Sequence, residues 1–147
     1  SGDVLFGLPA DPNGQFSVEK KEAVVVGGLA FPSVEHFFQA MKFHGTRYQA
    51  TTARCRCVSL GGARRAALLT PLQYMRTNWR EVKEGAMMQG LVAKFCGDET
   101  NVEKLLLTGD QRLVYTRRDD YWGVGEDGLC GRNRVGELLM RLRAAFK

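Results

Sequence analysis

The 147-residue sequence has few of the residues that metal centres and disulfide frameworks need. It contains four cysteines without any C-x-x-C spacing and only two histidines, His36 and His44. Structural zinc sites usually show paired ligands at short spacing, and "CRC" at 55–57 is not such a pair. We therefore expect no metal, no disulfide, and free thiols that are mostly buried in a reducing compartment.

Long apolar runs and targeting signals are also missing. The longest apolar run, "AVVVGGLAF", falls far short of the roughly 20 residues that cross a bilayer. The first residues lack the charged and then apolar order of a signal peptide, and Ser1-Gly2 resembles an expression scar. No G-x-S-x-G motif and no Walker Lys-Ser/Thr ending occur either. These absences predict an intracellular protein, cytoplasmic or nuclear, that does not work in a membrane.

The composition is that of one globular domain. A chain of 147 residues suits a single core, and its 44% hydrophobic and 25% charged content is ordinary for a folded protein. We find no internal repeat and no low-complexity segment, and we expect one monomeric domain over 1–147. The net charge of +5 and the pI of about 9.2 suit a phosphate-bearing or nucleic-acid ligand, although many basic proteins are merely soluble.

The hydrophobic pattern predicts an α+β fold that is rich in helix and has a few short strands. The β-branched run "EAVVV" at 22–26 is followed by two glycines, which predicts a strand that ends in a tight turn. A second strand is predicted over 112–116. Apolar spacing predicts helices over about 34–44, 63–70, 81–95, 101–107 and 135–146.

Polar and glycine residues mark the ends of these helices. Ser33 is the predicted N-cap of the first helix, and Gly45 is expected to end it. Asn78 and Glu81 have the spacing of a capping box before the long helix. Gly109 is expected to stop the helix over 101–107.

Glu35, Gln39 and Lys42 form a narrow polar stripe on the first predicted helix. At about 100° per residue, Gln39 and Lys42 fall within about 40° of Glu35, and Phe38 and Phe43 border the stripe. Two helical turns span roughly 10 Å, so the outer two side chains can both reach one ligand. Pattern alone favours a solvated stripe about two to one, but the bordering rings reduce that preference. A pocket floor is the alternative.

The segment "DDYWGVGEDGLCGRN" at 119–133 is predicted to be a structured loop. Trp122 beside Tyr121 either stacks on a base or sugar or pins the loop to the core, and both interpretations are equally supported. Asp119 and Asp120 are acid–base candidates or simple loop polar groups. "GRN" before the last helix either binds an anion or supplies an Asn cap. "GGARR" at 61–65 is a weak phosphate-binding signal.

Four stretches, taken together, resemble the NADAR (YbiA-like) family over about residues 6–146. They are "FPSVEHFFQAMKF", "NWREVKEGAMMQGLVAKF", "LLLTGDQRLV" and "DDYWGVGEDGLCGRNRVGELLMRLR", and they occur in the family's order and approximate spacing. The resemblance implies a compact helix-rich α+β domain. It also implies N-glycosidase chemistry, and we expect no cofactor and no metal.

The resemblance implies one of two substrates. One branch of the family removes ADP-ribose from modified guanine in DNA or nucleotides, and the other cleaves early riboflavin-pathway intermediates. The basic charge favours the first, so ADP-ribosylated guanine is the expected substrate and ADP-ribose the expected product. A non-catalytic ADP-ribose-binding module is a third interpretation. Glu35, Lys42 and Asp119 argue against it, because a module that only binds needs no nucleophile.

Matched position by position, the resemblance implies that Glu35, Lys42 and Asp119 are catalytic. The implied substrate-binding residues are Phe16, Ser17, Phe38, Gln39, Trp79, Tyr121, Trp122, Gly123 and Asn133. A partly desolvated Lys42 amine would displace the base from C1 of the opened ribose as a Schiff base. Attack by water with a carboxylate as base is the rival route. We expect the 119–122 loop to close over this sugar.

The chain departs from the family pattern where substrate contacts are expected. Where the family has the motif G-x-F-S-N-F, this chain has Val18 in place of Asn and Glu19 in place of Phe. Where the family has "LVE", this chain has Tyr115 in place of Glu. The next turn is one residue shorter, so the choice of Asp119 over Asp120 rests on spacing alone. These changes bear on which substrate is used more than on the reaction class.

Overall fold

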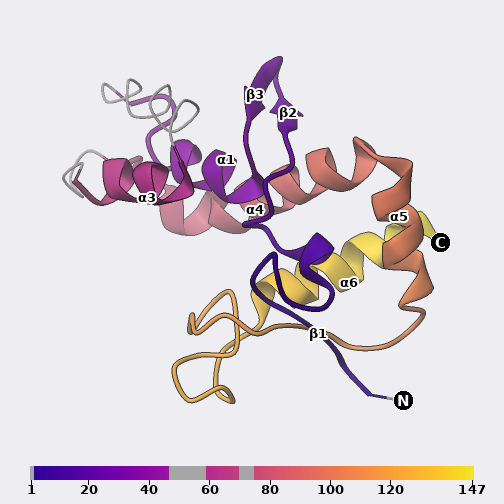
Figure 1. Cartoon of the computed structure of the whole chain (residues 1–147). Helices are drawn as coiled ribbons and strands as arrows, with labels where there is room; N and C mark the ends of the chain where they lie inside the picture. The colour runs from indigo at the N-terminus through magenta and orange to yellow at the C-terminus, as the bar shows by residue number, and fades with distance from the viewer. Residues whose placement is uncertain (1, 47–58, 70–74) are drawn as a thin grey trace. The chain divides into compact units, whose positions relative to one another are not determined.

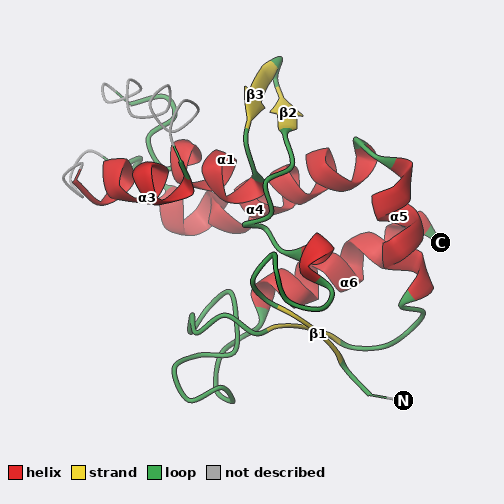
Figure 2. Ribbon diagram, viewed as in Figure 1, coloured by secondary structure: helices red, strands yellow, loops and turns green. Residues whose placement is uncertain are grey.

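A computed structural model describes residues 2–46, 59–69 and 75–147 (Figure 1). Two compact units can be distinguished, and each holds about half of the chain. The first consists of Ser1–Lys20 and Phe95–Lys147, and the second of Lys21–Lys94. Helices dominate the regular structure and the strands are short (Figure 2). The predicted α+β class is confirmed.

The first unit is built on a parallel pair of strands and two helices. β1 (Val4–Phe6) pairs with β4 (Leu113–Tyr115), so the start of the chain lies beside a segment more than a hundred residues later. α6 (Arg134–Phe146) contacts both β4 and α5 (Glu99–Leu107). The core of this unit is apolar, and its most deeply buried side chains include Phe6, Phe16, Phe95, Leu105, Leu113, Leu138 and Leu139.

Polar contacts fix the ends of the helices in this unit. The Asp98 carboxylate accepts a hydrogen bond from the Thr100 N–H at 2.9 Å and caps α5. Gly109, at φ 62°, follows the end of α5, as predicted. The buried Arg143 guanidinium donates to the Thr108 hydroxyl and the Gln111 carbonyl. It thereby fixes α6 to the turn that follows α5.

The described residues of the second unit form a β-hairpin and three helices. β2 (Val24–Val26) and β3 (Leu29–Phe31) are antiparallel, and Gly27 and Gly28 form the turn at φ 58° and 80°. Positive φ at both turn residues is what a two-residue hairpin requires. α1 (Val34–Met41) contacts β3 and α3 (Leu60–Leu69). α4 (Trp79–Cys96) begins in this unit and runs into the first without a break.

The end of α1 and the cap of α4 differ from the sequence prediction. α1 ends at Met41, three residues earlier than predicted. The N–H groups of Phe43 and His44 donate to carbonyls three residues back, and these turns continue to Gly45 at φ 78°. The predicted capping box of α4 is wrong. The Glu81 N–H donates to the backbone carbonyl of Asn78, whose side-chain oxygen accepts from Arg76 instead.

The cysteines also differ from expectation. Cys96 and Cys130 are free thiols, as predicted, but both are exposed rather than buried. Cys55 and Cys57 lie outside the described residues. Within residues 2–46, 59–69 and 75–147, no three His, Cys, Asp or Glu side chains lie close enough to hold a metal ion. No helix of these segments is both long and apolar enough to span a membrane.

Candidate functional site

The first turn of α1 fixes the orientation of the predicted catalytic helix. The Ser33 hydroxyl oxygen accepts a hydrogen bond from the His36 N–H at 3.1 Å, as predicted for an N-cap. The same oxygen lies 2.7 Å from Nδ1 of the buried His36 ring. His36 therefore serves the helix terminus. Glu35 stands beside it in the first turn, where the helix dipole favours a carboxylate.

Glu35, Gln39 and Lys42 form one continuous hydrogen-bonded chain along α1. Lys42 Nζ donates to Gln39 Oε1 at 2.9 Å. Gln39 Nε2 donates to Glu35 Oε1, also at 2.9 Å. Spacings of three and four residues bring successive side chains together on one helical face. The structure thus joins these three predicted site residues.

Burial decides between the two interpretations of this stripe. Gln39 is 8% exposed, and the Glu35 side chain is 13% exposed. A solvated stripe would leave both groups open to water, so the preference drawn from pattern alone is wrong. Arg64 of α3 lies beside the carboxylate, with its Nε 3.7 Å from Glu35 Oε1. Sequence reasoning did not place Arg64 in the site, and its one signal was the weak "GGARR" element.

Aromatic side chains border the hydrogen-bonded chain. The Phe38 and Trp79 rings lie 5.1 Å apart at a tilt of 53°. Lys42 Nζ lies 5.7 Å from the centroid of the Phe38 ring. The Arg76 N–H donates to the Lys42 carbonyl at 2.9 Å, which ties the chain just before α4 to the end of α1. An amine, a carboxylate and two ring systems therefore lie along one side of α1.

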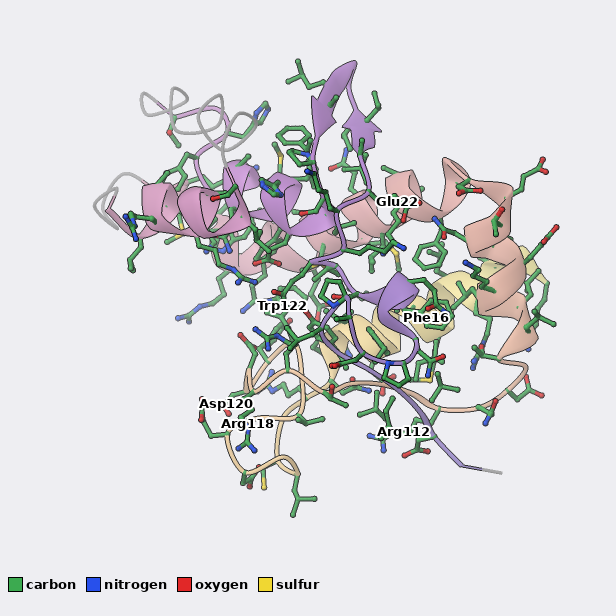
Figure 3. All side chains as sticks on the ribbon, viewed as in Figure 1. Phe16, Glu22, Arg112, Arg118, Asp120 and Trp122 are labelled. Carbon is green, nitrogen blue, oxygen red and sulfur yellow. The ribbon has the colours of Figure 1, made fainter. Side chains whose placement is uncertain are left out.

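The remaining predicted site residues belong to the first unit. Asp119 lies in the loop after β4, and its Oδ1 accepts hydrogen bonds from the N–H groups of Tyr121 and Trp122 at 2.9 and 2.7 Å. This oxygen therefore shapes the loop itself. Asp120 is the next residue of the same loop and is exposed (Figure 3). A catalytic role for Asp119 stays a prediction.

Trp122 is half-buried and contacts Tyr121 edge to face, with ring centroids 4.8 Å apart. Arg132 lies over the Tyr121 ring at 5.6 Å. A Cβ on Gly123 would lie 2.1 Å from the Arg117 carbonyl oxygen, so only glycine fits this position. Gly123 is therefore required by the loop whether or not it contacts substrate.

Three of the predicted substrate-binding residues have structural roles. The buried Asn133 amide accepts from the Tyr115 N–H at 2.8 Å and donates to the Leu113 carbonyl at 2.9 Å. Asn133 is the N-cap residue of α6 by position, as the Asn-cap interpretation has it, but its side chain makes no capping bond. Phe16 packs against Phe6 and Phe95 in the core. Ser17 is buried, and its hydroxyl oxygen accepts from the Glu19 N–H.

Two of the departures from the family pattern, Glu19 and Tyr115, contact each other. The Tyr115 hydroxyl donates to Glu19 Oε2 at 3.4 Å, and Arg117 Nε lies 2.7 Å from the same oxygen. The pattern has an aromatic residue at 19 and an acid at 115, and this chain has the reverse. Acid and aromatic ring have exchanged places across one contact. Sequence reasoning noted both changes but could not see that they are neighbours.

Two groups with shifted pKa values, Asp127 and Cys130, lie at the exposed tip of the loop. The Cys130 thiol and the backbone N–H groups of Leu129 and Cys130 bond to Asp127 and lower its pKa to about 2. In return, the hydrogen bond to Asp127 and the negative charge of the Asp127 carboxylate raise the pKa of the Cys130 thiol. This pair belongs to the loop turn and lies outside the predicted site residues.

Three comparisons place the chain among known proteins. It is 37% identical over 141 residues to N-glycosidase YbiA of Escherichia coli K12, covering 95% of this chain and 86% of that protein. It is 33% identical over 143 residues to a riboflavin biosynthesis protein of Vibrio vulnificus, covering 95% of this chain but 37% of that protein. The NMR structure of E. coli YbiA matches with a TM-score of 0.81 and 35% identity, over 99% of this chain and 86% of that one. Residues 10–147 match the NADAR domain. The chain therefore belongs to the NADAR domain family and has the fold of YbiA.

Proposed function

We propose that this protein is an N-glycosidase that hydrolyses the bond between ADP-ribose and guanine, in DNA or in nucleotides. The chain from Lys42 through Gln39 to Glu35, beside Phe38 and Trp79, is the observation that carries the reaction class. Cleaving an N-glycoside needs a nucleophile at C1 and an acid for the departing base. The names of the relatives as N-glycosidases support the same class.

The proposed mechanism uses Lys42 as the nucleophile. When the ribose ring opens, C1 carries the base as an imine. The neutral Lys42 amine adds to C1, the base leaves as its amine with a proton, and a lysine imine remains. Water then adds to that imine, restores the sugar aldehyde and releases the lysine. Glu35 moves protons in these steps or binds ribose hydroxyls. The rival is direct displacement by water with a carboxylate as base.

The basic charge supports a pyrophosphate-bearing substrate. The net charge is +5, and Arg64 keeps 41% of its side chain exposed beside Glu35. An arginine presents a planar fork of donors that matches phosphate oxygens. We further propose that Trp79 or Trp122 stacks on the base and that Asp119 assists proton transfer. Losses of kcat in Asp119→Asn, or of substrate affinity in the two Trp→Phe variants, test these roles.

A second candidate function has direct support from the relatives. One of them is named a riboflavin biosynthesis protein, and it matches 95% of this chain. The same amine and carboxylate would cleave the N-ribosidic bond of an early riboflavin-pathway intermediate. A protein that only binds ADP-ribose is the third outcome to be tested.

One experiment separates these functions. The purified protein is incubated with ADP-ribosylated guanine DNA and with the riboflavin-pathway intermediate, and release of the free base is followed by chromatography. We expect base release from the DNA substrate. Release from the intermediate alone would favour the second candidate. Binding of ADP-ribose without any release would leave only the binding function.

A second experiment tests the lysine route. Sodium borohydride added during turnover reduces an imine to a stable amine, so wild-type protein should gain the mass of the sugar moiety on Lys42. Lys42→Ala should gain nothing, whereas Lys104→Ala, which changes an exposed lysine of α5, should be trapped like the wild type. Turnover without any wild-type adduct would leave water as the nucleophile.

A further inference from the structure

Gln39 stands between the two charged groups of the candidate site and uses both ends of its amide. Its oxygen accepts from Lys42 Nζ and its nitrogen donates to Glu35 Oε1, each at 2.9 Å. The side chain is buried, and it lies about one helical turn from Glu35 and about one turn from Lys42. Its neighbours therefore fix the direction of the amide, with the acceptor towards the amine and the donor towards the acid.

The neutrality of this link matters for chemistry at Lys42. A carboxylate within about 4–6 Å of a lysine favours the protonated form. A protonated amine has no lone pair and cannot attack a sugar carbon. An amide offers the amine a hydrogen-bond acceptor without bringing a full negative charge to it. An acid at position 39 would have the same length and a carboxylate in place of the amide.

We propose that Gln39 is a positioning residue of the Lys42 centre, a neutral link that holds the amine at one end and Glu35 at the other and keeps the two from pairing directly. This inference rests on the proposed function. It gives Gln39 a role beyond substrate contact, and it explains why an amide suits this position better than an acid.

Other charged residues that adjoin this link come from the neighbouring elements. Arg64 of α3 lies 3.7 Å from Glu35 and offsets its negative charge at the far end of the link. Arg76, before α4, meets Lys42 through its backbone N–H, and its guanidinium donates to Asn78. Glu35 is the acid of α1 that the link holds away from Lys42.

The test compares Gln39→Glu with Gln39→Met. Gln39→Glu adds a negative charge, whereas Gln39→Met removes both hydrogen bonds and adds no charge. In Gln39→Glu, the pH at which kcat/KM rises should move up by about one unit, and kcat/KM at pH 7 should fall about tenfold. In Gln39→Met, kcat should fall at every pH with the midpoint little changed. A merely structural role would lower both profiles without moving either midpoint.

A titration without substrate tests the inference independently of turnover. The protein is labelled with ¹³C at lysine Cε, and the Lys42 signal is assigned from its loss in Lys42→Arg. The titration midpoint of Lys42 should be higher in Gln39→Glu than in wild type, and an unchanged midpoint would overturn the inference. If the midpoint moves while wild type cleaves neither substrate, the proposed function fails and the electrostatic role of Gln39 stands.

A second variant covers the case in which Gln39→Glu does not fold, which circular dichroism will show. Glu35→Gln removes the acid at the far end of the link. The Lys42 midpoint should then move by less than about half a unit, because the amide separates the two groups. A fall of more than one unit would mean that Glu35 acts on Lys42 directly, and the inference would be wrong.

Discussion

Asp127 and Cys130 form a hydrogen-bonded pair at the exposed tip of the loop between β4 and α6. The carboxylate accepts from the thiol and from two backbone N–H groups, so the pKa of Asp127 falls to about 2 and the pKa of Cys130 rises. A thiol with a raised pKa has less thiolate and reacts more slowly with electrophiles. We therefore expect the exposed Cys130 thiol at this tip to react slowly with electrophiles.

Asp127→Asn should make Cys130 more reactive. The variant removes the negative charge that raises the pKa of the thiol, so alkylation by iodoacetamide at pH 8 should be severalfold faster. Peptide mass spectrometry measures the rate at Cys130, and the exposed Cys96 of the same sample is the internal control. Equal rates at Cys130 in variant and wild type would contradict the prediction.

The same pair predicts how the stability of the loop changes with pH. The folded-state pKa of Asp127 is lowered, so its contribution is present above the ordinary pKa of an aspartate. That contribution is lost as the pH falls towards about 2. The protection of the Leu129 and Cys130 amides against hydrogen exchange, relative to the intrinsic exchange rate at each pH, should accordingly fall between about pH 4 and pH 2 in wild type. In Asp127→Asn it should show no such step.

Asn133 illustrates how a residue at the start of a helix can stabilise a neighbouring strand. Its amide satisfies one N–H and one carbonyl of β4, and its backbone adopts φ 51°, which favours Asn or Gly. Asn133→Gly keeps that backbone conformation and removes only the amide. We expect a loss of about 2–4 kcal/mol in the free energy of unfolding, because two buried polar groups lose partners. Urea denaturation measures it.

Asn133→Ala is the matched variant. It removes the same amide and adds a Cβ at a left-handed position, so it should be destabilised further by about 1 kcal/mol. A loss below about 0.5 kcal/mol in Asn133→Gly would mean that the two hydrogen bonds contribute little to β4.

At the scale of elements, α1 and α4 meet closely at Gly90. A Cβ added there would lie 2.9 Å from Val34 Cγ1 and 3.1 Å from Phe37 Cδ2. Gly90→Ala should lower the free energy of unfolding by about 1 kcal/mol, because overpacking exceeds the gain in helix propensity. On the same helix, a Cβ at Gly85 would have no atom within 4 Å, so Gly85→Ala should raise the free energy of unfolding by up to about 1 kcal/mol. Thermal melting measures both, and equal shifts would contradict the packing argument.

The contact of Glu19 with Tyr115 and Arg117 links β4 to the segment after the short 3-10 turn η1 (Gly14–Phe16). The Glu19 side chain is 8% exposed, so Glu19→Phe leaves Arg117 without the carboxylate that the structure pairs with it. We expect a loss of about 2 kcal/mol in the free energy of unfolding. Adding Tyr115→Glu restores the family's arrangement and should recover about half of that loss.

Double-mutant analysis decides whether the exchange is a coupled one. Glu19→Phe, Tyr115→Glu and the double variant are compared by urea denaturation. Coupled positions give an interaction energy of about 1 kcal/mol or more between the two changes. Strictly additive losses would show that the two departures arose independently of this contact.

The elements that could be predicted from the sequence are those whose pattern lies within one continuous segment of the chain. The apolar repeat of α6 is complete over thirteen residues, and the helix that it predicts lies within one residue of Arg134–Phe146. β1 was missed because three residues carry no readable period, and only pairing with β4 makes them a strand. The same holds for the site. Glu35, Gln39 and Lys42 share one helix, whereas Arg64 reaches Glu35 from another.

At the scale of the whole molecule, each compact unit contains one of the two tryptophans. Trp79 belongs to the second unit and Trp122 to the first. We predict that both units unfold in one transition, as the sequence analysis expects of a single domain. α4 runs unbroken across the boundary at Lys94, and half of this chain is too small to bury a large core alone.

Single-tryptophan variants measure this directly. Trp122→Phe leaves the fluorescence of Trp79, and Trp79→Phe leaves that of Trp122. In urea, each fluorescence curve should coincide with the circular dichroism curve of the same variant. In one variant the fluorescence midpoint could lie below the dichroism midpoint, and in the other variant above it. That result would show two independently folding domains.

The contact of Glu19 with Tyr115 also constrains how such a sequence can arise by descent. If the family pattern is the ancestral one, the exchange took two substitutions, and one of them came first. A first change at 115 leaves two aromatic residues and an arginine without its acid. A first change at 19 leaves two acids around Arg117, which keeps a partner throughout. The second order is the easier path, and relatives that carry acids at both positions are the intermediates to look for.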